Sequence, residues 1–156
     1  MPKTHTAYFG ELDYAEGAVF RFPNGLPGFD QERAFLFVNQ PHTEPLMFLQ
    51  SLNDPQLCFI LLPILVADAN YRVQLEAEDM AALHLPDGCQ PRLGEDILCA
   101  AIVSGGESPD EGPTANLMAP VVVNLKEQIG MQVIHADSPY SHRQPIGLGQ
   151  EMAPCS

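Results

Sequence analysis

Basic residues are scarce in this chain. Its 156 residues include 7 lysines and arginines against 20 aspartates and glutamates, which gives a net charge of −13 at pH 7. A surface of that sign repels nucleic acid, so no direct nucleic-acid partner is expected. The acidic excess is concentrated between Asp68 and Glu111, where Arg72 and Arg92 are the only lysines or arginines. This stretch is either a generally soluble surface or the complement of a basic protein partner.

Long hydrophobic runs are also lacking. The longest, Leu57–Val66, is interrupted by Pro63 and has about half of the roughly 20 residues that a membrane-spanning helix needs. The first six residues lack the apolar region of a secretory signal. We therefore expect no membrane partner and a cytoplasmic location.

Residue patterns for metal or cofactor binding are missing. The four cysteines form no C-x-x-C pair, and the five histidines are scattered along the chain. Zinc sites usually bring such residues together at short, regular spacings. We expect reduced cysteines, no metal and no cofactor, although an even number of cysteines leaves two disulfides possible.

Catalytic motifs are absent as well. The sequence contains no nucleophile elbow, P-loop, dinucleotide-binding glycine pattern or H-E-x-x-H pair. The glycine-rich segment Ser104–Ser108 lacks the lysine and threonine of a P-loop. Asp137, Ser138 and His142 have the side chains of a triad but fall within six residues of one another, whereas triads usually draw on separate elements. The sequence predicts a protein without enzymatic activity. The alternative left open is a small β-barrel enzyme whose site assembles only in three dimensions.

Fifteen prolines and twelve glycines divide the chain into short apolar runs. This spacing favours strands over helices. We predict a mainly β, single compact antiparallel β-barrel-like domain over residues 1–146, with a flexible tail at 147–156. One helix is expected at Glu76–Leu85 and a weaker helical turn at Asp30–Arg33. The predicted strands are Thr6–Leu12, Ala18–Phe22, Ala34–Val38, Met47–Ser51, Leu57–Pro63, Ile97–Val103, Ala115–Leu117, Val121–Asn124 and Gln132–His135.

A turn rich in proline and glycine follows the second predicted strand. Its prolines fix φ and its glycines permit positive φ, so the segment is expected to reverse the chain while its large apolar side chains fill the core. The residues that specify this turn are Phe22, Pro23, Gly25, Leu26, Pro27, Gly28 and Phe29.

Several motifs occur in order between residues 6 and 146. They are Tyr8–Leu12 with the turn Phe22–Phe29, then Leu49–Pro55, Asn116–Asn124, and Gln132–Ile134 followed by Tyr140. Together these segments resemble the FliW family, whose members share the turn F-P-x-G-L-P-G-F. Each motif also has a structural interpretation, because Asp54-Pro55 is a turn signal and Asn116 can hold the backbone at a hairpin's return.

The resemblance implies a β-barrel-like domain with a regulatory role in bacterial flagellum assembly. Family members bind the RNA-binding translational repressor CsrA, which they antagonise away from its RNA surface, and they also bind flagellin. Exchange of these partners couples flagellin synthesis to export. A chaperone for flagellin alone is the alternative function. The residues expected to contact partners are Glu95, Asp96, Glu107, Asp110, Glu111, Asn116 and Leu117.

Overall fold

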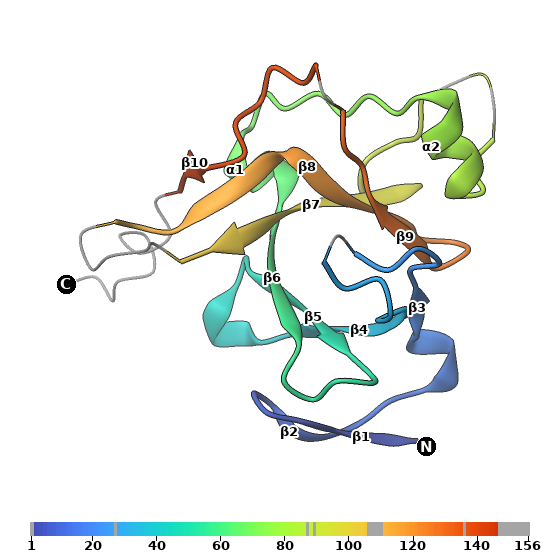
Figure 1. Cartoon of the computed structure of the whole chain (residues 1–156), viewed down its shortest axis with the longest axis vertical. Helices are drawn as coiled ribbons and strands as arrows, with labels where there is room; N and C mark the ends of the chain where they lie inside the picture. Colours follow the sequence, from blue (N-terminus) through green and yellow to red (C-terminus); the bar gives the residue numbers. More distant parts are fainter. Residues whose placement is uncertain are drawn as a thin grey trace.

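A closed ring of seven strands forms the body of the molecule (Figure 1). The computed structural model describes residues 2–26, 28–86, 88, 90–105, 111–135 and 137–146. Neighbours in the ring follow the chain order, and the last strand pairs with both the strand before it and the first strand. The ring consists of β3 (Phe20–Arg21), β4 (Ala34–Asn39), β5 (Met47–Ser51), β6 (Cys58–Pro63), β7 (Ile97–Ser104), β8 (Thr114–Asn124) and β9 (Ile129–Gln132).

The predicted class, a mainly β and barrel-like domain, is confirmed, and nearly all strand pairs are antiparallel. The exception is the closure of the ring, where β3 and β9 run parallel and meet at Arg21 and Ile129. The backbone N–H of Arg21 donates to the carbonyl of Gln128 at 2.9 Å. Besides the N-terminal hairpin described below, the short elements outside the ring are η1 (Glu16–Ala18), η2 (Pro41–Thr43), α1 (Ile64–Ala67), α2 (Ala77–Ala82) and β10 (Gln144–Pro145). The strand β10 pairs with the start of β8.

The predicted strand Thr6–Leu12 was wrong, because the chain reverses inside it. The structure has a hairpin of β1 (Lys3–Thr6) and β2 (Gly10–Asp13). The Thr6 hydroxyl holds the turn by accepting from the N–H of Phe9 and donating to the carbonyl of Gly10, both at 2.8 Å. A hydroxyl satisfies two backbone groups in this way, and Gly10 adopts the positive φ that the turn requires.

The predicted strands Ala115–Leu117 and Val121–Asn124 are instead parts of one strand, β8. Its register with β7 shifts midway, since Ala100 pairs with Val121 whereas Ile102 pairs with Asn116. The Asn116 carboxamide accepts hydrogen bonds from the N–H groups of Met118 and Ala119, both at 3.1 Å. Asn116 therefore ties down a bulge within a strand, not the return of a hairpin as expected.

Other boundaries also differ from the predictions. The helix α2 is shorter than Glu76–Leu85, because His84 adopts a left-handed φ of 57°. The run Ala18–Phe22 is divided between η1 and β3, and Asp30–Arg33 is not helical. The strand β9 begins and ends earlier than Gln132–His135. The helix α1 was missed because its apolar residues continue the run of β6.

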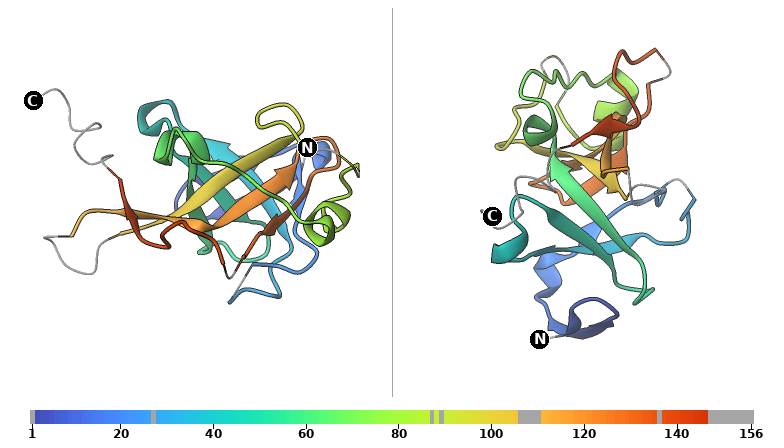
Figure 2. Two further views of the ribbon diagram at one scale, coloured as in Figure 1. Left: turned by 90° about the horizontal axis from the view of Figure 1, so that it is seen from above. Right: turned by 90° about the vertical axis from the view of Figure 1, so that its left-hand side faces the viewer.

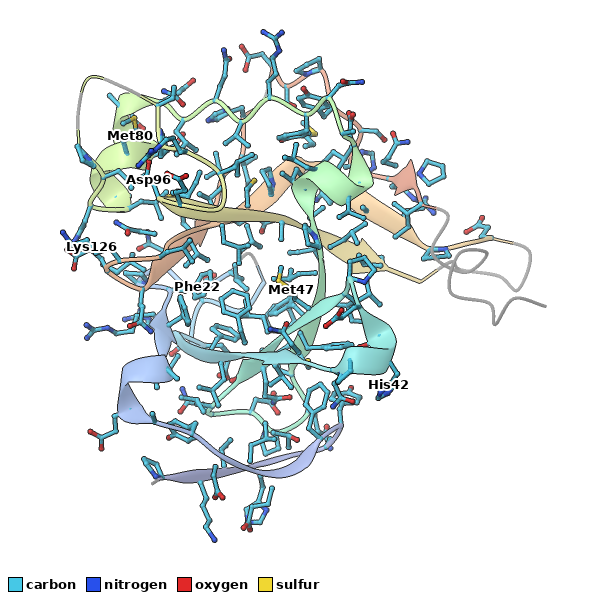
Figure 3. All side chains as sticks on the ribbon, turned by 180° about the vertical axis from the view of Figure 1, so that it is seen from behind. Phe22, His42, Met47, Met80, Asp96 and Lys126 are labelled. Atoms are coloured by element: carbon cyan, nitrogen blue, oxygen red, sulfur yellow. The ribbon has the colours of Figure 1, made fainter. Side chains whose placement is uncertain are left out.

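Two hydrophobic layers lie on the two sides of β7 and β8. The inner layer fills the barrel, where Figure 3 shows Phe22 and Met47, and consists of Phe22, Leu26, Phe35, Leu49, Leu61, Ala100, Val121 and Val123. The outer layer lies between the barrel and the chain from α1 through α2, and it is closed by the segment after β9 (Figure 2). Its buried members are Ile64, Leu75, Met80, Leu83, Ile97, Cys99, Ala101, Ala115, Leu117, Val122 and Val133. Burial on both faces explains why these strands show no polar alternation.

A buried glutamine and a serine anchor the hairpin between β5 and β6. The fully buried Gln50 side chain donates to the carbonyls of Ser51 and Leu57 at 3.0 and 3.1 Å. The Ser51 hydroxyl donates to Glu32 at 2.7 Å and accepts from the N–H of Asp54. The predicted turn at Asp54-Pro55 is confirmed, and its carbonyls lie against the Gln50 amide.

The glycine-rich turn reverses the chain as predicted, although Pro27 lies outside the described residues. Phe22 and Leu26 are buried in the barrel, with 0% and 1% of their surface exposed. Phe29 was expected in the core but is 41% exposed, and its ring lies edge-on against Phe59. Gly25 has a φ of +65°, and a Cβ built there lies 2.5 Å from the carbonyl oxygen of Phe29.

Gly25 and Gly28 provide a matched test of this turn. Gly28 has a φ of +87° with open space around it, so Gly28→Ala should lower the free energy of unfolding by about 1–2 kcal/mol through φ strain alone. Gly25→Ala adds a backbone clash, and a loss of about 2–5 kcal/mol is expected. Urea denaturation followed by circular dichroism measures both. Equal losses would show that the Phe29 carbonyl moves aside without cost.

Candidate partner-docking groove

A groove of about 410 Å³ lies between α2, the loop that leads to β7 and the turn between β8 and β9. Figure 3 shows Met80, Asp96 and Lys126 at this end of the molecule. Its lining combines apolar and ionised side chains, as expected for a surface that holds an amphipathic protein segment. The lining residues are Met80, His84, Leu85, Pro86, Gln90, Pro91, Glu95, Asp96, Asn124, Lys126 and Glu127.

A turn centred on Arg92 positions the two acidic residues that the sequence singled out. The Asp96 carboxylate accepts the backbone N–H of Arg92 at 2.8 Å and lies 3.4 Å from its guanidinium. Glu95 lies 2.6 Å from the same guanidinium. The backbone hydrogen bond, followed by the guanidinium, holds the pKa of Asp96 below its ordinary value. Asp96 therefore stays ionised at neutral pH.

The groove itself is only weakly negative. Glu95, Asp96 and Glu127 face it with Lys126, and Arg92 pairs with the first two. These three acidic and two basic groups leave one excess negative charge when His84, which also lines the groove, is neutral. Exposed ion pairs of this kind contribute little to stability. The net charge of the whole chain, −13, adds a long-range attraction for a basic partner to this small local excess.

Asn124 fixes the wall of the groove by joining α2 to the barrel. Its side-chain NH₂ donates to the carbonyl of Leu83 at 2.7 Å, and its side-chain oxygen accepts from the N–H of Lys126 at 3.0 Å. The first contact satisfies a carbonyl at the end of a short helix. The side chain of Gln90, which also lines the groove, pairs with both backbone groups of Leu75 at 3.0 Å.

His135 and Asp79 form a largely covered pair that the sequence did not reveal. The Nε2 of His135 lies 2.9 Å from the Asp79 carboxylate, and their side chains are 22% and 13% exposed. The same carboxylate accepts the N–H of Glu76 in a capping box at the start of α2. The residues lie 56 positions apart, so no local pattern could have indicated the contact.

The predicted contact residues do not form a single surface. Glu95 and Asp96 precede β7 beside the groove, whereas Glu111 lies at the other end of the β7–β8 pair, 3.6 Å from Arg143. Leu117 is 2% exposed and belongs to the outer core layer. Asn116 holds the bulge beside it. Glu107 and Asp110 lie outside the described residues.

Among the described residues, Asp137, Ser138 and His142 are not joined by the hydrogen bonds that a triad requires. Ser138 accepts the backbone N–H of Tyr140 at 3.2 Å, which is a turn contact and not a triad contact. Cys58 and Cys99 are free, and burial raises the pKa of their thiols to about 11 and about 12. Such thiols are poor nucleophiles at neutral pH.

In the described part of the chain, no three side chains of histidine, cysteine, aspartate or glutamate gather as metal ligands. None of the helices described there has the length and hydrophobicity to cross a membrane.

A family model, two relatives and a solved structure that match this chain all carry the same family name. The family model described as "FliW protein" matches residues 3–146. The flagellar assembly factor FliW of Bacillus licheniformis is 37% identical over 142 residues, covering 91% of this chain and 94% of that protein. The FliW of Bacillus subtilis is 34% identical and covers 92% and 95%. A crystal structure of the flagellar assembly factor FliW superposes with a TM-score of 0.79 at 28% identity, covering 92% of this chain and 96% of the other.

Asn124→Ala should loosen the groove wall, because it leaves the carbonyl of Leu83 without its side-chain donor. We expect the free energy of unfolding to fall by about 1–3 kcal/mol. Relative to the parent protein, amide hydrogen exchange should increase more in α2 than in β5. Asn53→Ala is the matched control, since the Asn53 side chain is exposed and its removal should change stability by less than about 0.5 kcal/mol. Similar losses in both variants would contradict the role given to Asn124.

Proposed function

The chain belongs to the FliW family of flagellar assembly factors, and we propose that it works by binding proteins: it antagonises the translational repressor CsrA and binds flagellin. Alternate binding of these partners would couple flagellin synthesis to flagellum assembly. The family match over residues 3–146 supports the assembly role. The partners follow from the family resemblance of the sequence motifs.

The charge of the chain is the observation that best supports CsrA as a partner. A protein of net charge −13 attracts a basic RNA-binding protein and repels the RNA that such a protein holds. The groove adds a place where a basic, partly apolar segment fits, since exposed Glu95 and Glu127 stand beside Leu85 and Pro86.

Antagonism does not require contact with the RNA surface of CsrA. Binding at a second surface of CsrA lowers its RNA affinity if this chain prefers the CsrA conformation that binds RNA more weakly. Flagellin that occupies the chain would leave CsrA free to repress, and export of flagellin would return the chain to CsrA. The proposed role needs binding alone, without catalysis.

Association rates measured against salt test the assignment of the groove. The Debye length falls from about 10 Å at 0.1 M to about 3 Å at 1 M ionic strength, so association with CsrA should slow as salt rises. The variant Glu95→Gln/Glu127→Gln should slow CsrA association at low salt several-fold, on the order expected for loss of local steering. Flagellin association should change less.

The control carries the same change of charge elsewhere. Asp30→Asn/Glu44→Gln removes two carboxylates that are exposed and lie outside the groove. Glu111→Gln tests the other end of the acidic stretch. Equal slowing by the groove variant and the control would reject the groove as the CsrA contact. Binding to flagellin without binding to CsrA would instead support a chaperone for flagellin alone.

A further inference from the structure

The N-terminal hairpin of β1 and β2 lies outside the barrel sheet. Among the described residues, its two strands pair only with each other, from Lys3 opposite Asp13 to Thr6 opposite Gly10. Figures 1 and 2 show it at the end of the molecule opposite α2, beneath β4 and β5. The ring of strands closes through β3, β8 and β9, so its closure does not depend on the hairpin.

Few contacts fasten the hairpin to the barrel. The ring of Phe9 lies edge-on to that of Phe48, with centroids 5.3 Å apart and planes at 65°. Among the described residues, the one backbone hydrogen bond from the hairpin to the barrel joins the N–H of Ala7 to the carbonyl of Pro55 at 2.8 Å. Both contacts come from the three-residue turn that connects β1 to β2.

The hairpin has internal contacts that are separate from this attachment. The Thr6 hydroxyl closes the turn, and the N–H of Tyr14 donates to the carbonyl of Pro2 at 3.0 Å. Lys3 and Glu11 form an exposed ion pair across the strands. An isolated two-stranded hairpin is at best marginally stable in water, so its order in this molecule depends on the attachment through Phe9.

The surface beneath the turn is apolar and uncharged. A pocket of about 200 Å³ there is lined by Tyr8, Phe9, Phe48, Cys58 and Ile60. Phe48 and Ile60 are direct cross-strand partners on β5 and β6. Their neighbours Leu49 and Leu61 belong to the core inside the barrel, so Phe48 and Ile60 lie on its outer face.

We propose that the hairpin is a displaceable strap whose Phe9 partly covers an apolar strip formed by Phe48, Cys58 and Ile60, of which Ile60 remains 38% exposed. Opening breaks the aromatic contact and the hydrogen bond to Pro55 while the ring of barrel strands stays intact. A state of this kind is a local opening that needs less free energy than global unfolding.

Hydrogen exchange of the parent protein in low concentrations of denaturant tests the local character of the opening. The paired amides of β1 and β2 should exchange faster than those of β5 and β6, and their rates should depend little on denaturant. Exchange of the hairpin and barrel amides at one rate, with one denaturant dependence, would overturn the proposal.

Thiol labelling with N-ethylmaleimide, read by peptide mass spectrometry, tests the role of Phe9. Cys58 reports on the strip, and the buried Cys99 in the outer core layer reports on loss of the barrel. Phe9→Ala should speed labelling of Cys58 roughly two- to tenfold, the factor expected from loss of an aromatic pair. Labelling of Cys99 should not change. Lys3→Ala, which removes only the exposed ion pair, is the control and should leave both rates unchanged.

Two outcomes of the labelling experiment would also reject the strap. An unchanged rate at Cys58 in Phe9→Ala would show that the ring does not govern access to the strip. An equal increase at Cys99 would show that the barrel opens together with the hairpin. The exchange experiment uses the parent protein, so it decides the question even if Phe9→Ala folds poorly.

Discussion

Burial of β7 and β8 on both faces is the constraint on which the rest of the structure depends. One face of this pair fills the barrel, and the other supports the layer formed by α1, α2 and the segment after β9. The strand β8 also pairs with β7, β9 and β10, so it joins the ring to the outer layer. A polar substitution at Val122 or Val123 would place an unpaired group in one of two cores.

Side-chain amides and hydroxyls hold the irregular backbone that this arrangement requires. Asn116 pairs with the bulge in β8, Asn124 joins the end of α2 to the barrel, and Gln50 collects the carbonyls of the β5–β6 turn. Each replaces a partner that regular pairing would have supplied, which matters because buried backbone groups without partners are costly. These residues belong to the family-like motifs, so the motifs are explained largely by the fold.

The proposed groove and the apolar strip lie on different parts of the barrel. The groove beside α2 combines carboxylates with apolar side chains, whereas the strip beneath the N-terminal hairpin has no charged lining residue. The helix α2 and the N-terminal hairpin, which border them, lie at opposite ends of the molecule (Figure 1). The lining chemistry of the two surfaces therefore differs, and the proposed contact with CsrA concerns the groove alone.

Local signals in the sequence determined the class of fold, the position of most strands, the region of α2 and the reversal at Gly25. Prolines, glycines and short apolar runs act through neighbouring residues, so one sequence suffices to interpret them. The motifs also indicated the family, because they specify the same turns and bulges. The sequence further located Glu95 and Asp96 within an acidic stretch, but it could not separate them from Glu111.

Only the tertiary structure decided which distant residues meet. The parallel contact of Arg21 with Ile129 and the pair of His135 with Asp79 join segments that carry no sign of each other in the sequence. The burial of Leu117 and the groove itself have the same origin, since both depend on the outer layer folding back over β8. Such contacts form when the whole chain buries its apolar surface, and that choice is made by packing between elements and not by local preference.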